Sequence, residues 1–269
     1  MIDALGFSFF QQALLAGVFA AILCGVVGTL VVVNRIVFLA GGIAHAAYGG
    51  IGLAVFLGLP FAVGVSIVTI SAAFLMAVAS LKWTHQADTI IGVLWAVGMA
   101  MGIILLDITP GYQADLMSYL FGSILAVSTA DIWRMTIGAV LVLALLAVFF
   151  RSFLAISYDP DFAKLRGIPV KVLYFLSVGM VALCVVLLIR VVGLILVIAL
   201  FTIPPFIAEK YTQTLAGMMA LSVVLSLVFT TLGLFLAYFY DLTSGAAIVL
   251  VAAGGFFIVL FTKRASLRA

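Results

Sequence analysis

His45 is the residue of this chain best suited to bind a metal. It stands in the apolar run FLAGGIAHAAYGGIG, among five glycines and three residues before Tyr48, on nearly the same face of a helix. An ionisable side chain inside such a run usually faces a polar path or the interior of a helix bundle, and neutral imidazole is a common ligand of transition metals. A hydrogen bond in the core is the alternative role, because one histidine alone does not make a metal site. His45 is therefore a candidate ligand whose partners the sequence does not assign.

Other side chains with metal-binding atoms have simpler expected roles. Met99 and Met101 could offer thioethers to a soft metal, but methionine in an apolar helix mostly fills space. Cys24 and Cys184 lie deep in apolar runs, where a small buried hydrophobic residue is expected rather than a disulfide or a soft metal contact. His85, in KWTHQAD, is expected to be a solvated loop residue.

Four aspartates are expected near the outer surface of the membrane. Together they could attract cations electrostatically, with ordinary solvation at the interface as the alternative for each. They are Asp107, Asp115, Asp131 and Asp241.

Enzyme motifs are absent from the sequence. It contains no H-E-x-x-H, no nucleophile elbow and no glycine-rich phosphate loop ending in G-K-[ST]. The chain is therefore expected not to be an enzyme, and any source of energy must lie on another chain.

The composition indicates an all-α membrane protein. Of the 269 residues 67% are hydrophobic and 8% are charged, and the mean hydropathy is +1.47. A soluble domain carries about 25% charged residues. The apolar runs are continuous and long enough for helices, whereas a membrane barrel would alternate in segments of about ten residues. The net charge of +3 is too small to suggest nucleic acid as a partner. We expect one polytopic transmembrane domain over residues 1–269, in contact with membrane lipid.

The apolar runs predict nine spans, at about 9–33, 37–58, 61–80, 88–106, 128–150, 170–189, 191–208, 213–237 and 244–262. With the N-terminus outside, ten of the twelve basic residues fall on the inner side, as the positive-inside rule requires. This distribution predicts a multi-pass protein of a bacterial-type cytoplasmic membrane with a cytoplasmic C-terminus. Only Arg134 and Arg190 fall outside, and the inner ten are Arg35, Lys82, Arg151, Lys164, Arg166, Lys171, Lys210, Lys263, Arg264 and Arg268.

Two segments fit this pattern less well. Residues 107–130 have an apolar core of only about 12 residues, which suits a re-entrant or interfacial helix better than a crossing. In residues 191–208 the pair Pro204-Pro205 predicts either a helix broken at membrane depth or a plain helix end before Glu209.

Residues 158–171, YDPDFAKLRGIPVK, form a charged and proline-containing island between apolar spans. Asp159 and Asp161 would complement the positive end of a short helix, with Lys164 and Arg166 toward its other end. Phe162 and Leu165 would form a small apolar face, and Gly167 followed by Pro169 would end the helix. We expect a short helix displayed on the membrane surface for another protein to bind.

Most of the chain resembles the permease subunits of the ABC-3 family of metal-uptake ABC transporters, which are distantly related to vitamin B12 and siderophore permeases. The order and spacing of several pieces carry the resemblance: NRIVFLAGGIAHAAYGG, DTIIGVLWAVGMAMGI, DLMSYLFGSIL, DPDFAKLRGI, VGLILVIALFTIPPFIA and DLTSGAAIVLVAAGGFFIVLF. The fold that the resemblance implies is a transmembrane helix bundle of about eight or nine spans, like the type II ABC importers.

The resemblance also implies partners and a coupling element. Two permease copies, a homodimer, would work with two cytoplasmic ATPases that bind ATP, and a metal-binding protein on the outer side would deliver the metal. Closure of the ATPases would switch the permease between outward-open and inward-open states. The helix that docks into the ATPase would comprise Asp159, Pro160, Asp161, Phe162, Ala163, Lys164, Leu165, Arg166 and Gly167.

One departure from the family pattern concerns the metal path. The family motif reads roughly F-L-G-D-x-I-x-H, and its aspartate and histidine contribute to that path. Here His45 matches the histidine, but Gly41 stands in place of the aspartate. Without a carboxylate the site is softer, so we expect zinc ahead of manganese, with iron also considered.

A permease for a metal chelate, siderophore or cobalamin is the alternative. An ion-coupled secondary transporter fits less well, because nearly all acidic residues lie in loops.

Overall fold

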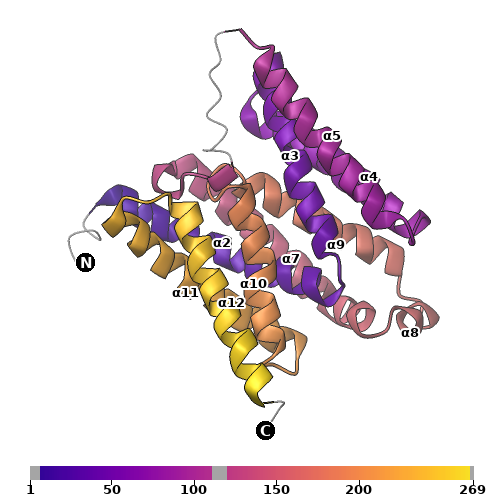
Figure 1. The fold of residues 1–269 in the computed structure, drawn as a ribbon. Coiled ribbons are helices and arrows are strands. Elements are labelled where there is room, and N and C mark those ends of the chain that lie inside the picture. Colours follow the sequence, from indigo (N-terminus) through magenta and orange to yellow (C-terminus); the bar gives the residue numbers. More distant parts are fainter. Residues whose placement is uncertain (1–6, 111–119, 267–269) are drawn as a thin grey trace. The chain divides into compact units, whose positions relative to one another are not determined.

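The structure is a computed structural model that describes residues 7–110 and 120–266 (Figure 1). Every regular element in these two ranges is a helix, which confirms the predicted fold class. Within these two ranges, eight helices are long and apolar enough to cross a membrane. Each begins within two residues of a predicted span: α2 Ser8–Val33, α3 Val37–Leu57, α4 Phe61–Lys82, α5 Ala87–Asp107, α7 Thr129–Tyr158, α9 Val170–Leu188, α11 Leu215–Tyr240 and α12 Ser244–Ser266.

The ninth predicted span is a shorter helix, α10 Leu194–Glu209. Its 16 residues are fewer than the roughly 20 that a crossing needs. The reason lies at its start, where Gly193 has a φ of +82° and delays the helix by three residues relative to the prediction. Among the described residues, eight of the nine predicted crossings are therefore supported, and α10 is the exception.

The proline pair does not break α10. The helix continues through Pro204-Pro205 and ends at Glu209, close to the predicted helix end. Because proline has no N–H group, the carbonyls of Leu200 and Phe201 lose their partners along the helix. A Cβ at Gly28 of α2 would lie 2.7 Å from the Phe201 carbonyl oxygen, so the backbone of α2 packs directly against one of these carbonyls.

The predicted interfacial segment 107–130 lies partly outside the described residues, and its crossing stays a prediction. The described part after residue 119 contains the short helix η1 Ile124–Ala126. Gly122, with a φ of +69°, packs against the backbone of Val192 and Gly193. Gly245 at the start of α12 packs against the Phe121 carbonyl. The chain before α7 is thus held by backbone contacts at glycines.

The chain divides into two compact units, each made of segments distant in the sequence. The first comprises Met1–Val32, Met117–Ala139 and Arg190–Ala269. In it α10, α11 and α12 pack against one another, and α2 approaches α10 and α11. A Cβ at Gly25 would lie 2.7 Å from the backbone nitrogen of Val223, and the Thr29 hydroxyl donates to Ser222 over 3.3 Å.

The second unit comprises Val33–Leu116 and Val140–Ile189. Helix α3 packs against α4, α5 and α9, and the short helix α8 Pro160–Leu165 packs against α9. Both units contain part of α7. That residues 1–269 act as one permease domain stays a prediction.

Glycines bring the backbones of α3, α4 and α5 into direct contact. A Cβ at Gly50 would lie 2.6 Å from the Val65 Cα of α4, and one at Gly49 would lie 2.7 Å from the Gly98 carbonyl oxygen of α5. Small residues permit this approach in membranes, where packing rather than the hydrophobic effect drives helix association. The glycines around His45 are therefore contact points between helices.

Replacing Gly50 with Leu should destabilise the second unit, because the new side chain would overlap the α4 backbone. Overpacking of this kind lowers the free energy of unfolding by about 1–3 kcal/mol. The measurement is thermal unfolding of the purified protein in detergent. Gly254→Leu is the matched control, since a Cβ at Gly254 meets no atom within 4 Å. Equal midpoints for the two variants would contradict the packing account.

Candidate functional site

His45 lies on α3 with one ring nitrogen bonded and the other available. Its Nδ1 lies 2.8 Å from the Gly41 carbonyl oxygen. Because a carbonyl can only accept a hydrogen bond, Nδ1 carries the proton and Nε2 keeps its lone pair in the neutral ring. This is the arrangement of most metal-binding histidines, in which the second nitrogen is fixed by a backbone carbonyl or a carboxylate. The half-buried imidazole is thus chemically ready to bind a metal through Nε2.

Trp95 of α5 holds the other side of the imidazole. The two ring centroids lie 4.1 Å apart with planes inclined by 32°. The Trp95 Nε1–H group donates to the Met99 sulfur over 3.1 Å, one helical turn further along. The Met99 thioether therefore orients the tryptophan in this structure, which is a more specific role than space filling. Tyr48 is buried against Gly102, so it and His45 both face α5, as their spacing predicted.

Open space lies beside Gly41. A Cβ built at this glycine would meet no atom within 4 Å, although the residue itself is buried within α3. Gly41 is also the residue whose carbonyl holds His45. A side chain or water molecules could therefore occupy the place next to the imidazole where the family motif has its aspartate.

The described residues contain no group of three or more His, Cys, Asp or Glu side chains that could hold a metal ion. Cys24 and Cys184 are buried and form no disulfide, as expected, and His85 is an exposed loop residue, as expected. His45 is thus the one predicted metal ligand that the described geometry keeps as a candidate, and its role stays a prediction.

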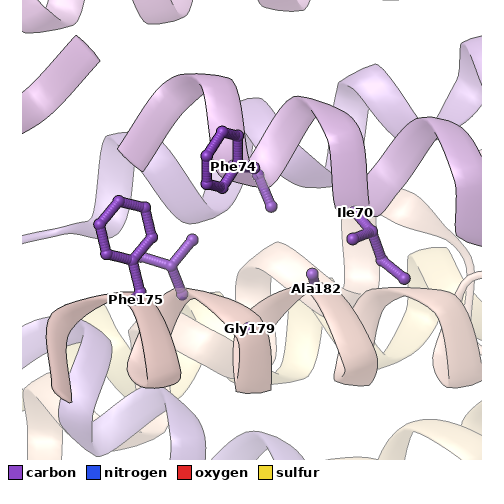
Figure 2. A pocket seen from close by; sticks show the side chains of 7 residues that line it. Ile70, Phe74, Phe175, Gly179 and Ala182 are labelled. Atoms are coloured by element: carbon purple, nitrogen blue, oxygen red, sulfur yellow. The ribbon is translucent and has the colours of Figure 1, made fainter. Parts of the chain in front are cut away.

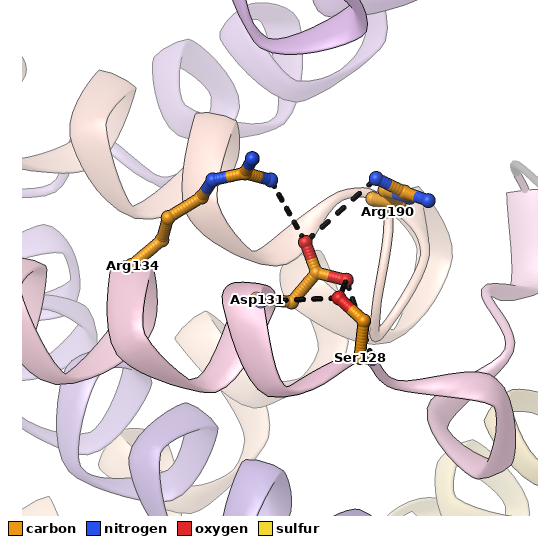
Figure 3. A network of polar contacts seen from close by, with 4 residues as sticks. All are labelled: Ser128, Asp131, Arg134 and Arg190. Atoms are coloured by element: carbon orange, nitrogen blue, oxygen red, sulfur yellow. Dashed lines mark hydrogen bonds and ion pairs between the residues drawn. The ribbon is translucent and has the colours of Figure 1, made fainter.

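Asp131 is not a free carboxylate of the predicted cation-attracting surface. It is buried at the start of α7, where its Oδ1 lies 3.0 Å from Arg134 Nη1 and 3.8 Å from Arg190 Nη1 (Figure 3). The Ser128 hydroxyl donates to Asp131 Oδ2 over 2.6 Å and accepts from the Asp131 N–H over 3.2 Å. Asp131 and Ser128 therefore cap the first turn of α7. The Asp131 carboxylate also offsets part of the positive charge of Arg134 and Arg190, the two basic residues predicted to lie outside. Asp107 and Asp241 are exposed, and Asp115 lies outside the described residues.

The charged island forms the short helix α8 Pro160–Leu165, capped at both ends. Asp159 is the N-cap, and its Oδ1 accepts from the N–H groups of Asp161 and Phe162 over 3.0 and 2.9 Å. Pro160 occupies the first helical position, where its missing N–H group costs nothing. These caps account for a stable helix of only 6 residues.

The other end of α8 is a glycine-terminated cap. Gly167, with a φ of +76°, donates to the Lys164 carbonyl, and Ile168 donates to that of Ala163. This pair of bonds is the Schellman motif. The helix proper is shorter at each end than the predicted 159–167, because Asp159 and Arg166 are its caps.

One face of α8 is packed and the other is exposed. Ala163 is fully buried, whereas Phe162 is 51% and Leu165 87% exposed. The Arg166 guanidinium lies 5.2 Å from the centre of the Phe162 ring. Tyr158, immediately before the cap, is 76% exposed. Exposed apolar side chains on a rigid, capped helix are suited to binding a protein partner.

Beneath α8 the chain is tied to the turn before α3. A hollow of about 430 Å³ is lined there by residues 33–35, 156–158 and 160 and by Val170 and Tyr174 of α9. The Ser157 hydroxyl donates to Asn34 Oδ1 over 3.3 Å. A displacement of α8 would therefore act on both α9 and the start of α3.

Two features of these sites were not predicted from the sequence. The stacking of Trp95 on His45 depends on the rotation of α5 about its axis, although the i, i+4 spacing of Trp95 and Met99 was a signal for their contact. The bonds of Asp131 to Ser128 could have been predicted from S-T-A-D, a serine followed three residues later by an acid at a helix start.

Known proteins are similar to this chain along nearly its whole length. The family model described as ABC 3 transport family matches residues 6–263. An uncharacterised membrane protein of Synechocystis is 44% identical over 98% of this chain and 94% of its own length. The manganese transport system membrane protein MntC of Listeria monocytogenes is 34% identical over 97% of this chain and 93% of its own. A solved chain of PsaBC from Streptococcus pneumoniae, in complex with Fab, is 32% identical, with a TM-score of 0.86 over 96% of this chain and 93% of that one.

These matches confirm the resemblance drawn from the motifs and agree with the helical architecture. The family model and the MntC relative are named for transport rather than for an enzyme activity, so the hydrolysis of ATP belongs to a separate chain. This multi-pass membrane protein is a member of the ABC 3 transport family.

Proposed function

We propose that the chain is the permease subunit of an ATP-driven importer of manganese. The observation that carries the proposal is its 34% identity, over nearly the full length of both chains, with a protein named for manganese transport. The available Nε2 of His45 and the open space beside Gly41 agree with a metal path in the second unit. Two copies of this chain would work with two cytoplasmic ATPases and an outer metal-binding protein, with the C-terminus in the cytoplasm.

Manganese takes precedence here over zinc, which the missing carboxylate favoured in the sequence. Mn²⁺ prefers oxygen ligands, including water. An imidazole without such oxygens beside it would suit zinc instead. Water molecules in the space beside Gly41 would supply such oxygens next to His45. Zinc and iron are thus competitors to be tested rather than the proposed cargo.

A permease for a metal chelate or cobalamin is the second candidate. The lack of a carboxylate at Gly41 favours it, because a chelated metal needs no ligand from the permease. The test is the rate of free ⁵⁴Mn²⁺ uptake in the presence of an excess of a metal chelate. If the chelate does not lower this rate, the second candidate is excluded.

Replacing His45 with Ala should lower manganese uptake about tenfold or more, since losing even an outer partner of a metal ligand costs about 10–100-fold. The measurement is the initial rate of ⁵⁴Mn²⁺ uptake in cells that lack their own manganese importers. His85→Ala is the matched control, because His85 is an exposed loop residue. Equal rates for both variants and the wild type would remove His45 from the metal path.

Replacing Gly41 with Asp should favour manganese over zinc as cargo. The carboxylate would enter open space beside His45 and add a hard oxygen ligand. We expect a lower manganese concentration at half-maximal uptake and weaker competition by zinc. Gly41→Asn provides the same shape without the charge. An aspartate variant that behaves like the asparagine variant would show that no metal passes this position.

Replacing Leu165 with Asp should abolish uptake while the protein still inserts and folds. Leu165 is 87% exposed, so the charge disturbs a binding partner rather than the core. The measurement pairs ⁵⁴Mn²⁺ uptake with co-purification of the ATPase subunit, and Leu165→Met is the apolar control. Full uptake by the aspartate variant would contradict the proposal that α8, with residues 159–167, is the coupling element.

A further inference from the structure

An apolar groove runs between α4 and α9 on the second unit (Figure 2). Its volume is about 420 Å³, within the range of ligand-binding pockets. All seven lining residues are apolar: Ile70, Ala73, Phe74, Phe175, Val178, Gly179 and Ala182.

The groove is open to the surface, and Gly179 of α9 forms part of its floor. Phe74 and Phe175 stack with centroids 5.6 Å apart at one end. Ile70 and Phe74 are about 60% exposed. A Cβ at Gly179 would meet no atom within 4 Å, so this glycine leaves the floor of the groove empty. A long, narrow apolar ligand could therefore lie along the two helices.

The two helices run antiparallel, so both bring a basic residue to the same end of the groove. Phe74 stacks on Phe175 at one end of the groove, and Ile70 and Ala182 line it further along, so residue numbers rise in opposite directions along the two helices (Figure 2). Lys82 ends α4, eight residues or about 12 Å beyond Phe74. Lys171 lies in the first turn of α9, four residues or about 6 Å before Phe175.

This basic end also has an aromatic residue and a hollow. Lys82 Nζ lies 4.8 Å from the centre of the Trp83 ring, and Trp83 is 45% exposed. A polar hollow of about 340 Å³ is lined by residues 82–86. Lysine and tryptophan at the end of a membrane helix are typical of the level of the lipid headgroups. Neither α4 nor α9 contains an acidic residue.

We propose that this groove binds an anionic phospholipid, with one acyl chain between Phe74 and Ala182 and the phosphate at Lys82 and Lys171. The apolar lining fits a hydrocarbon chain, and the basic end fits a negative headgroup. A second copy of the chain fits less well. In a symmetric dimer of parallel membrane proteins the same patch would face itself, so the four lysines would meet without any acid from these helices.

The proposal does not depend on the cargo of the importer. Basic residues near a membrane surface strengthen binding of anionic lipid about fivefold each. The expected preference for phosphatidylglycerol over phosphatidylcholine of the same acyl chains is therefore about 25-fold when both lysines contribute.

Native mass spectrometry of the full chain in detergent, with each lipid added in turn, tests the site. We expect one phosphatidylglycerol to remain bound to the wild type. Gly179→Leu should lose it by filling the floor, while Gly254→Leu, which also extends into open space, should retain it. Lys82→Gln with Lys171→Gln should remove the preference for phosphatidylglycerol, while Lys210→Gln on the other unit should not.

Three results would overturn the proposal. The first is equal retention of the two lipids by the wild type, and the second is undiminished retention by Gly179→Leu. The third is a change of oligomeric mass in Gly179→Leu with lipid binding intact, which would assign the groove to a second copy. Since Lys82 and Lys171 are exposed, the double glutamine variant keeps the test valid even if Gly179→Leu folds poorly.

Discussion

The close approach of α3 to α4 and α5 is the constraint on which the second unit depends. Gly50 rests on the backbone of α4, and Gly49 and Gly52 rest on that of α5. In a membrane, helices gain little from hydrophobic association, so close packing of this kind is a main source of stability. It also fixes the rotation of α3, which places His45 against Trp95 and leaves the space beside Gly41 open. The candidate metal ligand is thus positioned by helix packing together with its hydrogen bond to the Gly41 carbonyl.

The second unit also contains α8, the helix proposed to couple the chain to the ATPase. Helix α8 packs on α9, and α9 packs on both α3 and α4. The Ser157–Asn34 hydrogen bond joins the segment before α8 to the turn before α3. Packed neighbours and hydrogen bonds of this kind can carry coupling between distant sites. The caps of α8 matter here, because a frayed helix would absorb a displacement that a rigid one passes on.

The helices were predicted from the sequence more completely than the contacts within the candidate sites. Continuous apolar runs predicted the positions of eight spans, and Asp159 at one end with Gly167 and Pro169 at the other predicted the ends of α8, because these signals are local. The length of α10 was missed, since it depends on the backbone conformation of Gly193. The state of Asp131 was also missed, because Arg190 reaches it from another segment of the first unit. Which side chains meet across helices depends on their rotation, which a single sequence does not specify.

The proposed function is transport of manganese by this chain, driven by a separate ATPase that hydrolyses ATP. The most direct measurement is ⁵⁴Mn²⁺ accumulation in proteoliposomes that contain the purified chain and the ATPase that co-purifies with it, supplied with ATP on the ATPase side and the metal-binding protein on the other. The account predicts accumulation that needs ATP, the binding protein and this chain together. Accumulation without ATP, or none with all components present while another metal is transported, would contradict it.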